Sequence, residues 1–455
     1  MPHRNVMSRK KTRAAWPVIL LIIAFLCPTE FSLYLAGLRL PPHRVALLII
    51  MPLALWRLLA QKGLKFRSFD LAFVLFNVWT IAIYMYHQGQ DEGLVYGGSL
   101  ALESLGSYLV ARVWIRNSEQ FMATLRVMAA AIMAAALIAL PETLFGQIFT
   151  HDILKTLTGY AHPVAVETRL HLTRAYGTFD HPIHYGTFCA ALLAMFWYSE
   201  QHASTRYKAV AMVTIATLLG LSSAPILCLG LQAFMLLWEH QTRHIKSRTG
   251  ISLAILAGLY IGASFVMTRS PVNFIATGMT LDPWTGYYRL QIWENGLNNV
   301  YGDPWTGIGL KDWVRPWWMV SPTVDAFWLV TLMREGVPAA LLLVSGIVLL
   351  ARSVTRRGMA NSDFLVRRLA RGWMMSLIAL CLVGTTVHFW NVLHAFLFFF
   401  LGLAGWMADP RRAPSRVSKA QQAARYRVHT LGPLPVAPAQ PQHWPPPYYP
   451  AGAMT

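Results

Sequence analysis

The sequence of 455 residues has little charge and little cysteine. Only 13% of its residues are charged while 55% are hydrophobic, a composition that cannot give a soluble protein a surface of ordinary polarity. The four cysteines, Cys27, Cys189, Cys228 and Cys381, lie in apolar stretches, without paired spacing and without a neighbouring histidine cluster. These absences argue against a soluble domain, a disulfide framework and a cysteine-ligated metal site, and we interpret the cysteines as core residues.

What the chain has instead is a series of apolar stretches that predict membrane-spanning helices. Twelve spans are expected: Trp16–Leu35, Val45–Leu59, Leu71–Tyr86, Val95–Trp114, Phe121–Leu140, Ile183–Tyr198, Ala209–Leu221, Ala224–Trp238, Ile251–Met267, Ala326–Ala351, Trp373–Val387 and Val392–Trp406. The predicted fold is therefore an all-α, polytopic transmembrane bundle over residues 1–408. A tail at 409–455, rich in Pro, Ala, Arg and Gln, is expected to be disordered, with a Pro-rich docking peptide as the alternative.

The positive charge is distributed by loop and not gathered on one domain. A net charge of +19 could suggest nucleic acid, but Lys and Arg concentrate at the amino terminus and in alternate loops, and we expect no nucleic-acid partner. The positive-inside rule places these loops and both termini in the cytoplasm. The stretch 208–238 is short for two spans, but basic residues flank both of its ends, so the chain is expected to cross twice and turn near Ser222.

The first of two long polar loops on the opposite side runs from Gly146 to Pro182. Its end carries Arg174, and then His181 and His184 at the start of an apolar helix. A guanidinium forms bidentate hydrogen bonds to phosphate, and the N–H groups of a helix start add partial positive charge, so this segment can hold a diphosphate. Alternatively the glycine and proline only shape a turn while the arginine meets lipid headgroups. The two histidines lack a nearby third ligand for a metal.

The second polar loop, 269–323, combines Arg289 with a high density of tryptophan. Aromatic faces stack on the C–H faces of sugar rings, and Trp313, Trp317 and Trp318 are the candidates for a glycan groove. The alternative is that most of these indoles anchor the chain at the bilayer interface.

Three segments in this order resemble the O-antigen ligase and O-antigen polymerase group of bacterial polytopic glycosyltransferases, which act on glycans linked to undecaprenyl diphosphate. They read "RAYGTFDHPIHYG" from residue 174, "YYRLQIWENGLNNVYGDPWTGIGL" from residue 287 and "DAFWLVTLMREGVPAALLL" from residue 325. The first is similar to that family's Arg-x-x-Gly-x-Phe-x-x-Pro entry to a helix. The second is similar to its Arg-x-x-x-Trp stretch followed by Pro-x-x-Gly-x-Gly, and the third to its His-Asn or Asp-Asn start of a span.

The resemblance implies a metal-independent glycosyltransferase of the bacterial inner membrane that needs no cofactor. It also implies that Arg174 and Arg289 hold the lipid-linked diphosphate. Its partners would be the undecaprenyl-diphosphate-linked glycan, membrane lipids, a chain-length regulator and the export machinery. Ligases of the family typically have a histidine where this chain has Asp325, and Ser-Arg-Gly where this chain reads "SSAP" at 222–225. These departures favour a polymerase of exopolysaccharide or O-antigen repeat units.

The chemistry of such a transfer assigns further roles. A sugar C1 bound to diphosphate already has a good leaving group, so arginines are needed to neutralise the developing charge, and Arg334 can reach a phosphate as a third cation. The acceptor hydroxyl needs a base, for which Asp325 is the first candidate and His181 and His184 are the next. Partial desolvation would raise the pKa of Asp325 toward a useful value, and the alternative role for this residue is a helix N-cap.

Three other functions remain open from the sequence. A ligase would move the finished glycan from the lipid carrier to lipid A-core or another acceptor. A polysaccharide transporter or flippase also fits twelve spans, but the two halves of the chain show no similarity and the outer loops are unequal, which favours an enzyme. A noncatalytic assembly partner would tolerate loss of Arg174 and Arg289.

Overall fold

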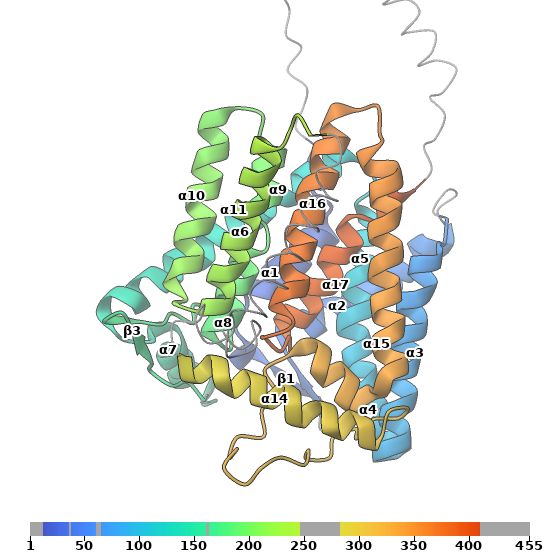
Figure 1. Ribbon diagram of the computed structural model, residues 1–455, viewed down its shortest axis with the longest axis vertical. Coiled ribbons are helices and arrows are strands. Elements are labelled where there is room, and N and C mark those ends of the chain that lie inside the picture. The colour runs from blue at the N-terminus through green and yellow to red at the C-terminus, as the bar shows by residue number, and fades with distance from the viewer. Residues whose placement is uncertain (1–11, 36–37, 61–64, 161–162, 246–282, 410–455) are drawn as a thin grey trace, which may run out of the picture. The chain divides into compact units, whose positions relative to one another are not determined.

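A computed structural model describes residues 12–35, 38–60, 65–160, 163–245 and 283–409. The described part is mostly helical (Figure 1). Within it, four helical segments have the length and apolar composition to cross a bilayer, which indicates a membrane protein: Pro42–Ala60, Ser68–Gln88, Ser118–Phe145 and Phe327–Met359. The predicted span at 251–267, the first part of the second polar loop and the predicted tail after residue 409 lie outside the described residues.

The described helices follow one another along the chain with two short hairpins between them. The α-helices are α1 (Trp16–Leu26), α2 (Pro42–Ala60), α3 (Ser68–Gln88), α4 (Gln90–Ala101), α5 (Ser107–Trp114), α6 (Ser118–Phe145), α7 (Phe149–Thr158), α8 (Pro182–Ala190), α9 (Leu193–Ser199), α10 (Ala203–Leu219), α11 (Ser223–Gln241), α14 (Pro283–Gly302), α15 (Phe327–Ser353), α16 (Phe364–Val383), α17 (Val392–Leu403) and α18 (Gly405–Ala408). A 3-10 turn, η1 (Thr29–Phe31), and two π-helical segments, η2 (Leu102–Gly106) and η3 (Val354–Met359), join them. The antiparallel hairpins pair β1 (Leu33–Leu35) with β2 (Leu38–Leu40), and β3 (Thr168–Arg169) with β4 (Leu172–Thr173).

Several predicted spans differ from the helices that form. The span expected over 16–35 is helical only to Leu26, because Pro28 disfavours helical backbone at Cys27 and cannot donate a hydrogen bond itself. The span expected over 183–198 is interrupted between α8 and α9. The first polar loop contains the amphipathic helix α7 in addition to the β3–β4 hairpin. The turn expected near Ser222 lies between α10 and α11.

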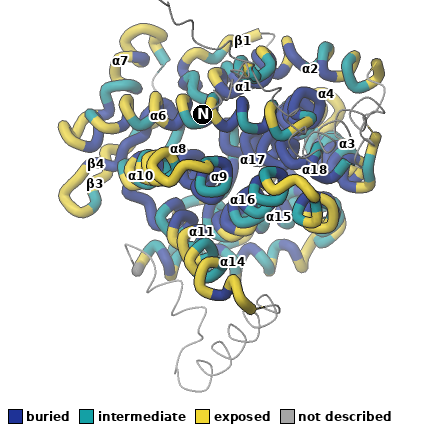
Figure 2. The backbone as a smooth tube through the Cα atoms, turned by 90° about the horizontal axis from the view of Figure 1, so that it is seen from above, coloured by how far each residue is buried: buried dark blue, intermediate teal, exposed yellow. Residues whose placement is uncertain are grey.

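Helix α17 forms the centre of the main core. All of its residues are buried, and it packs against α5, α8 and η2. A helix that is hydrophobic all round must be covered on every side, and the run "AFLFFFL" from residue 395 meets that description. Figure 2 shows α17 buried near the middle of the bundle, with largely exposed helices such as α10 toward the outside.

A buried ion network joins α5 to α3 and to Asp409, the residue after α18. Nε of Arg112 on α5 lies 3.1 Å from Oδ1 of Asp70 on α3, and its two terminal nitrogens donate to Asp409 at 2.8 and 2.9 Å. Tyr108 also donates to Asp70. Because the charges are paired and hydrogen-bonded, Arg112 can be buried without an isolated charge.

The elements that carry the candidate site lie at one end of the bundle. In Figure 1, β1, the beginning of α4 and α14 are found together at that end, away from the beginnings of α10 and α16. The turn between α16 and α17 and the beginning of α15 also belong to it, because Phe327 donates its backbone N–H to Val387 at 3.0 Å.

The close approach of α5 and α17 predicts a sensitive glycine. A Cβ added at Gly402 would lie 2.4 Å from the carbonyl oxygen of Tyr108, whereas one added at Gly230 would meet nothing within 4 Å. We expect Gly402→Ala to destabilise the protein by about 1–3 kcal/mol through overpacking. The matched change Gly230→Ala should leave stability unchanged or raise it by up to about 1 kcal/mol. Thermal unfolding in detergent measures both, and equal melting temperatures for the two variants would contradict the packing.

Candidate functional site

Arg174 is buried at the end of the β3–β4 hairpin and is only 3% exposed. One terminal nitrogen is paired with Glu167, and the other donates to Oγ of Ser222 at 2.8 Å. Its Nε is buried and has no hydrogen-bond partner among the described residues. The guanidinium is therefore held in place on one side and unsatisfied on the other, and it does not lie on the protein surface.

The carboxylate of Glu142 holds the segment that carries Arg174. This side chain, at the end of α6, accepts the backbone N–H groups of Tyr176 at 3.0 Å and Gly177 at 2.8 Å. It also accepts the N–H of Thr150 at 3.4 Å. A single buried carboxylate thus ties the first polar loop to the bundle two and three residues after the arginine.

Arg289 interacts electrostatically with both Asp325 and Arg174. Arg289 lies on α14, and its Nε is buried without a partner among the described residues. Burial lowers the pKa of Arg289, which the charge of Asp325 opposes and the charge of Arg174 reinforces. Burial raises the pKa of Asp325, and the positive charge of Arg289 opposes that rise. Three charged residues far apart in the sequence therefore share one electrostatic environment.

Asp325 does not cap the helix that follows it. The N-cap of α15 is Ala326, and no side chain accepts a hydrogen bond there. The N-cap alternative for Asp325 is therefore wrong, because the backbone at Ala326 is already extended and α15 begins one residue later than that role requires.

His181 and His184 lie beside Trp390, which belongs to the turn between α16 and α17. Nδ1 of His181 accepts the N–H of Ile183 at 3.1 Å and caps α8. Nε2 of His184 lies 3.0 Å from the carbonyl oxygen of His388, to which it donates. The rings of His184 and Trp390 are 3.7 Å apart between centroids. Each histidine thus uses one ring nitrogen to hold local structure.

The three tryptophans proposed as a glycan groove have different surroundings. Trp313 is buried in a small core under the second polar loop, and its Nε1 donates to the carbonyl of Pro322 at 3.0 Å. Trp318 contacts the ring of Tyr288 edge-on. Trp317 is 92% exposed. Only Trp317 presents a free face, while Trp313 supports the loop from inside.

The second polar loop docks on a kink in α15, next to Arg334. Gly336 has a φ of 81° inside this helix, and the carbonyls of Met333 and Arg334 accept N–H groups from Ile308 and Gly309 at 2.8 and 3.0 Å. A Cβ added at Gly307, where φ is 64°, would lie 2.6 Å from the carbonyl oxygen of Met333. The Pro-x-x-Gly-x-Gly segment therefore permits a close backbone contact that places the loop against Arg334.

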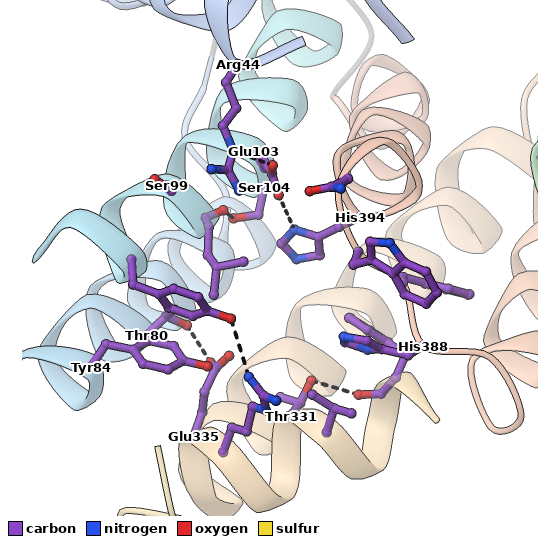
Figure 3. Close-up of a pocket in the computed structure, with 18 of the residues that line it drawn as sticks. Arg44, Thr80, Tyr84, Ser99, Glu103, Ser104, Thr331, Glu335, His388 and His394 are labelled. Carbon is purple, nitrogen blue, oxygen red and sulfur yellow. Dashed lines mark hydrogen bonds and ion pairs between the residues drawn. The ribbon is translucent and has the colours of Figure 1, made fainter. Parts of the chain in front are cut away.

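Arg334 borders two cavities, of about 360 and 350 Å³. The smaller is lined by the second polar loop, including Trp313 and Val324. The larger lies among α3, α4, α15 and the α16–α17 turn and is shown in Figure 3. Arg334 also contacts the hydroxyl of Tyr96, at 3.4 Å.

Glu103, on one wall of the larger cavity, is fully paired. Its Oε1 lies 2.9 Å from Nε2 of His43 and 2.7 Å from Nε of Arg44, and its Oε2 lies 3.4 Å from Nδ1 of His394. On the opposite wall, Thr80 donates to Glu335 at 2.6 Å. Figure 3 shows these two carboxylates facing the open centre from different helices, with His388 on a third side.

The sequence matches no model of a protein family and no curated protein. The chemical character of the site therefore rests on its own residues. Among the described residues, no three His, Cys, Asp or Glu side chains are grouped so that they could hold a metal ion.

The arrangement can neutralise an anion and accept a proton next to it. Arg174 and Arg289 supply charge and unsatisfied N–H groups, and Asp325 supplies a carboxylate that burial makes more basic than an exposed one. Sequence reasoning did not single out Arg44, His388, His394 or Trp390, which line the larger cavity. The sequence pointed to His388 and Trp390 only through the short interval between the spans predicted at 373–387 and 392–406, since each of these residues is unremarkable by itself.

The Glu142 contacts generate a prediction about the first polar loop. We expect Glu142→Ala to leave the N–H groups of Tyr176 and Gly177 without their acceptor, so that these amides exchange with solvent at least about tenfold faster. Exposed Glu92, replaced by alanine in the same way, is the matched control and should not change that segment. Hydrogen exchange followed by mass spectrometry measures both, and unchanged protection of 165–177 in the Glu142 variant would contradict the role of this carboxylate.

Proposed function

We propose that this protein is a membrane glycosyltransferase that polymerises undecaprenyl-diphosphate-linked oligosaccharide repeat units on the extracytoplasmic face, for exopolysaccharide or O-antigen synthesis. The observation that carries the proposal is the convergence of Arg174, Arg289 and Asp325 from three separate segments. A pair of arginines beside a carboxylate suits a substrate with an anionic leaving group and a hydroxyl nucleophile.

The two arginines support a diphosphate as the anion. Each has a buried Nε–H without a partner among the described residues, and a buried donor is costly to leave unsatisfied. Phosphate oxygens would accept hydrogen bonds from both donors.

The proposed reaction balances without a further reactant. A hydroxyl oxygen of the acceptor attacks C1 of the donor sugar, and the bond between C1 and the phosphate oxygen breaks. Undecaprenyl diphosphate leaves with that electron pair, and Arg174 and Arg289 stabilise the charge it gains. The proton of the acceptor hydroxyl passes to the carboxylate of Asp325.

We further propose a bacterial inner-membrane protein with twelve spans and both termini in the cytoplasm. The support is that the candidate site residues and the β1–β2 hairpin occur in segments that the charge pattern assigns to the outside.

Accessibility of single cysteines, in a background with the four native cysteines replaced by alanine, tests this orientation. Val320→Cys, which is 84% exposed before substitution, should react with an impermeant maleimide in intact spheroplasts, and exposed Lys65→Cys only after lysis. The reverse pattern would refute the orientation.

The arginines are tested by the size of the lipid-linked glycan. Arg174→Ala and Arg289→Ala should each lower the polymerisation rate by about 100-fold or more, because charge stabilisation at the leaving group is lost. Single repeat units would then accumulate outside. Arg174→Lys should recover activity only in part, since lysine keeps the charge but cannot form the bidentate pair. Exposed Arg243, replaced by alanine, is the control.

The same experiment separates the alternatives. Polymer made at the wild-type rate by correctly inserted arginine variants would refute the diphosphate role. In cells that lack the protein, full-length polymer left on the lipid carrier would indicate a ligase, and single units retained inside would indicate a flippase.

The role of Asp325 predicts a pH dependence. The base must be ionised, so activity is present above the pKa of Asp325 and is lost as the pH falls through it. Because burial raises that pKa, the loss should occur at a higher pH than about 3.9, the ordinary value for aspartate. Asp325→Asn should reduce the rate by about 10²–10⁴-fold, while exposed Asp91→Asn on α4 should not. A full rate in Asp325→Asn would rule out this carboxylate as the base. So would a residual activity in that variant that still falls at low pH as it does in the wild-type protein.

A further inference from the structure

The larger cavity beside Arg334 has hydrogen-bonding groups of both kinds in its wall. Arg334 can only donate and the carboxylate of Glu335 accepts, while the hydroxyls of Tyr84, Ser99 and Thr331 can do both. Trp390 adds an aromatic side chain to the same wall. Figure 3 shows Tyr84, Thr331 and Glu335 on one side of the space, with Ser99 and Glu103 across from them.

This mixture argues against a simple ion as the occupant. A diphosphate in the cavity would face the carboxylates of Glu103 and Glu335 as well as the arginines. A metal cation would face Arg44 and Arg334. Glu103 is already satisfied by His43, Arg44 and His394. The wall therefore suits a neutral molecule whose groups both donate and accept hydrogen bonds, and sugar hydroxyls do so.

One buried polar atom has no protein partner. Nδ1 of His388 is buried and makes no hydrogen bond within the described residues, although His388 lines the cavity. Burial, aided by the charge of Arg334, lowers the pKa of His388 to about 3. The ring is therefore neutral at physiological pH, and it can form one hydrogen bond with a neutral ligand without placing a charge beside it.

The cavity is also next to the proposed base. Val330 and Arg334 line both this cavity and the smaller one. Asp325 directly follows Val324, which lines the smaller cavity, and lies two residues before Phe327, which lines the larger. A sugar ring in the larger cavity would lie close to the segment that carries Asp325.

We propose that the larger cavity is the subsite for the sugar that accepts the transferred glycan, the non-reducing terminal sugar of the repeat unit. This inference rests on the proposed function and adds the acceptor to it. Glu335 and Tyr84 bind its hydroxyls, His388 makes one neutral hydrogen bond, and Trp390 contacts a ring face.

The test measures binding and needs no catalysis. The probe is the repeat-unit oligosaccharide released from the lipid carrier of cells that lack the protein, and it is titrated calorimetrically into purified full-length protein in nanodiscs. Glu335→Gln and Tyr84→Phe, which keep the shape of the side chains, should each weaken binding by about tenfold, as expected for loss of one good hydrogen bond. Glu239→Gln, in a carboxylate paired with Arg371, and exposed Tyr207→Phe are the matched controls and should stay within about twofold.

Two further probes distinguish the acceptor sugar from the donor sugar. Removal of the non-reducing terminal sugar should abolish binding, while reduction of the reducing-end sugar to its alditol should not change it. The opposite pattern would assign the cavity to the donor sugar and overturn the proposal. Absence of binding by the wild-type protein, or equal binding by the cavity variants, would overturn it too. Polymer size in cells decides the proposed function separately, so a failure of one can be told from a failure of the other.

Discussion

The candidate site depends on pairing carboxylates that are buried between helices. An isolated charge in an apolar interior is strongly unfavourable, so each buried acid must find donors. Glu142 accepts backbone N–H groups from the first polar loop. Glu103 links α2 to α17 through His43 and His394. Glu335 joins α15 to α3 through Thr80. The same contacts that satisfy these acids hold loops and helices around the cavity, so stability and site geometry have one origin.

The kink in α15 provides a second constraint. Non-helical backbone at Gly336 leaves the carbonyls of Met333 and Arg334 available to the second polar loop, which supplies their hydrogen-bond donors. The loop shares with α14 and the beginning of α15 a small core that contains Trp313. Asp325 precedes this helix, and Arg334 lies about two turns inside it. Loop docking therefore sets the position of the proposed base relative to both cavities.

Candidate residues could be chosen from the sequence, although their roles stay predictions. Arg174, Arg289 and Asp325 were selected because a guanidinium suits a diphosphate and a carboxylate can act as a base, and because the segments that carry them resemble the ligase and polymerase group. Roles that depend on surroundings could not be selected in this way. Trp313 was a candidate for a glycan groove but lies inside the small core under the loop. His388 became a candidate only because one of its ring nitrogens has no hydrogen-bond partner among the described residues.

The sequence by itself determined the membrane class, the helical character and the polar loops that carry the charge, because hydropathy and charge spacing are local properties of the chain. Only the tertiary structure decided which charges meet. The contact of Arg174 with Ser222 spans 48 residues, and that of Glu103 with His394 spans 291. Such pairs depend on how helices pack and where they are interrupted, as at Cys27 and Gly336. Packing and interruption follow from contacts among many side chains at once, which no local pattern contains.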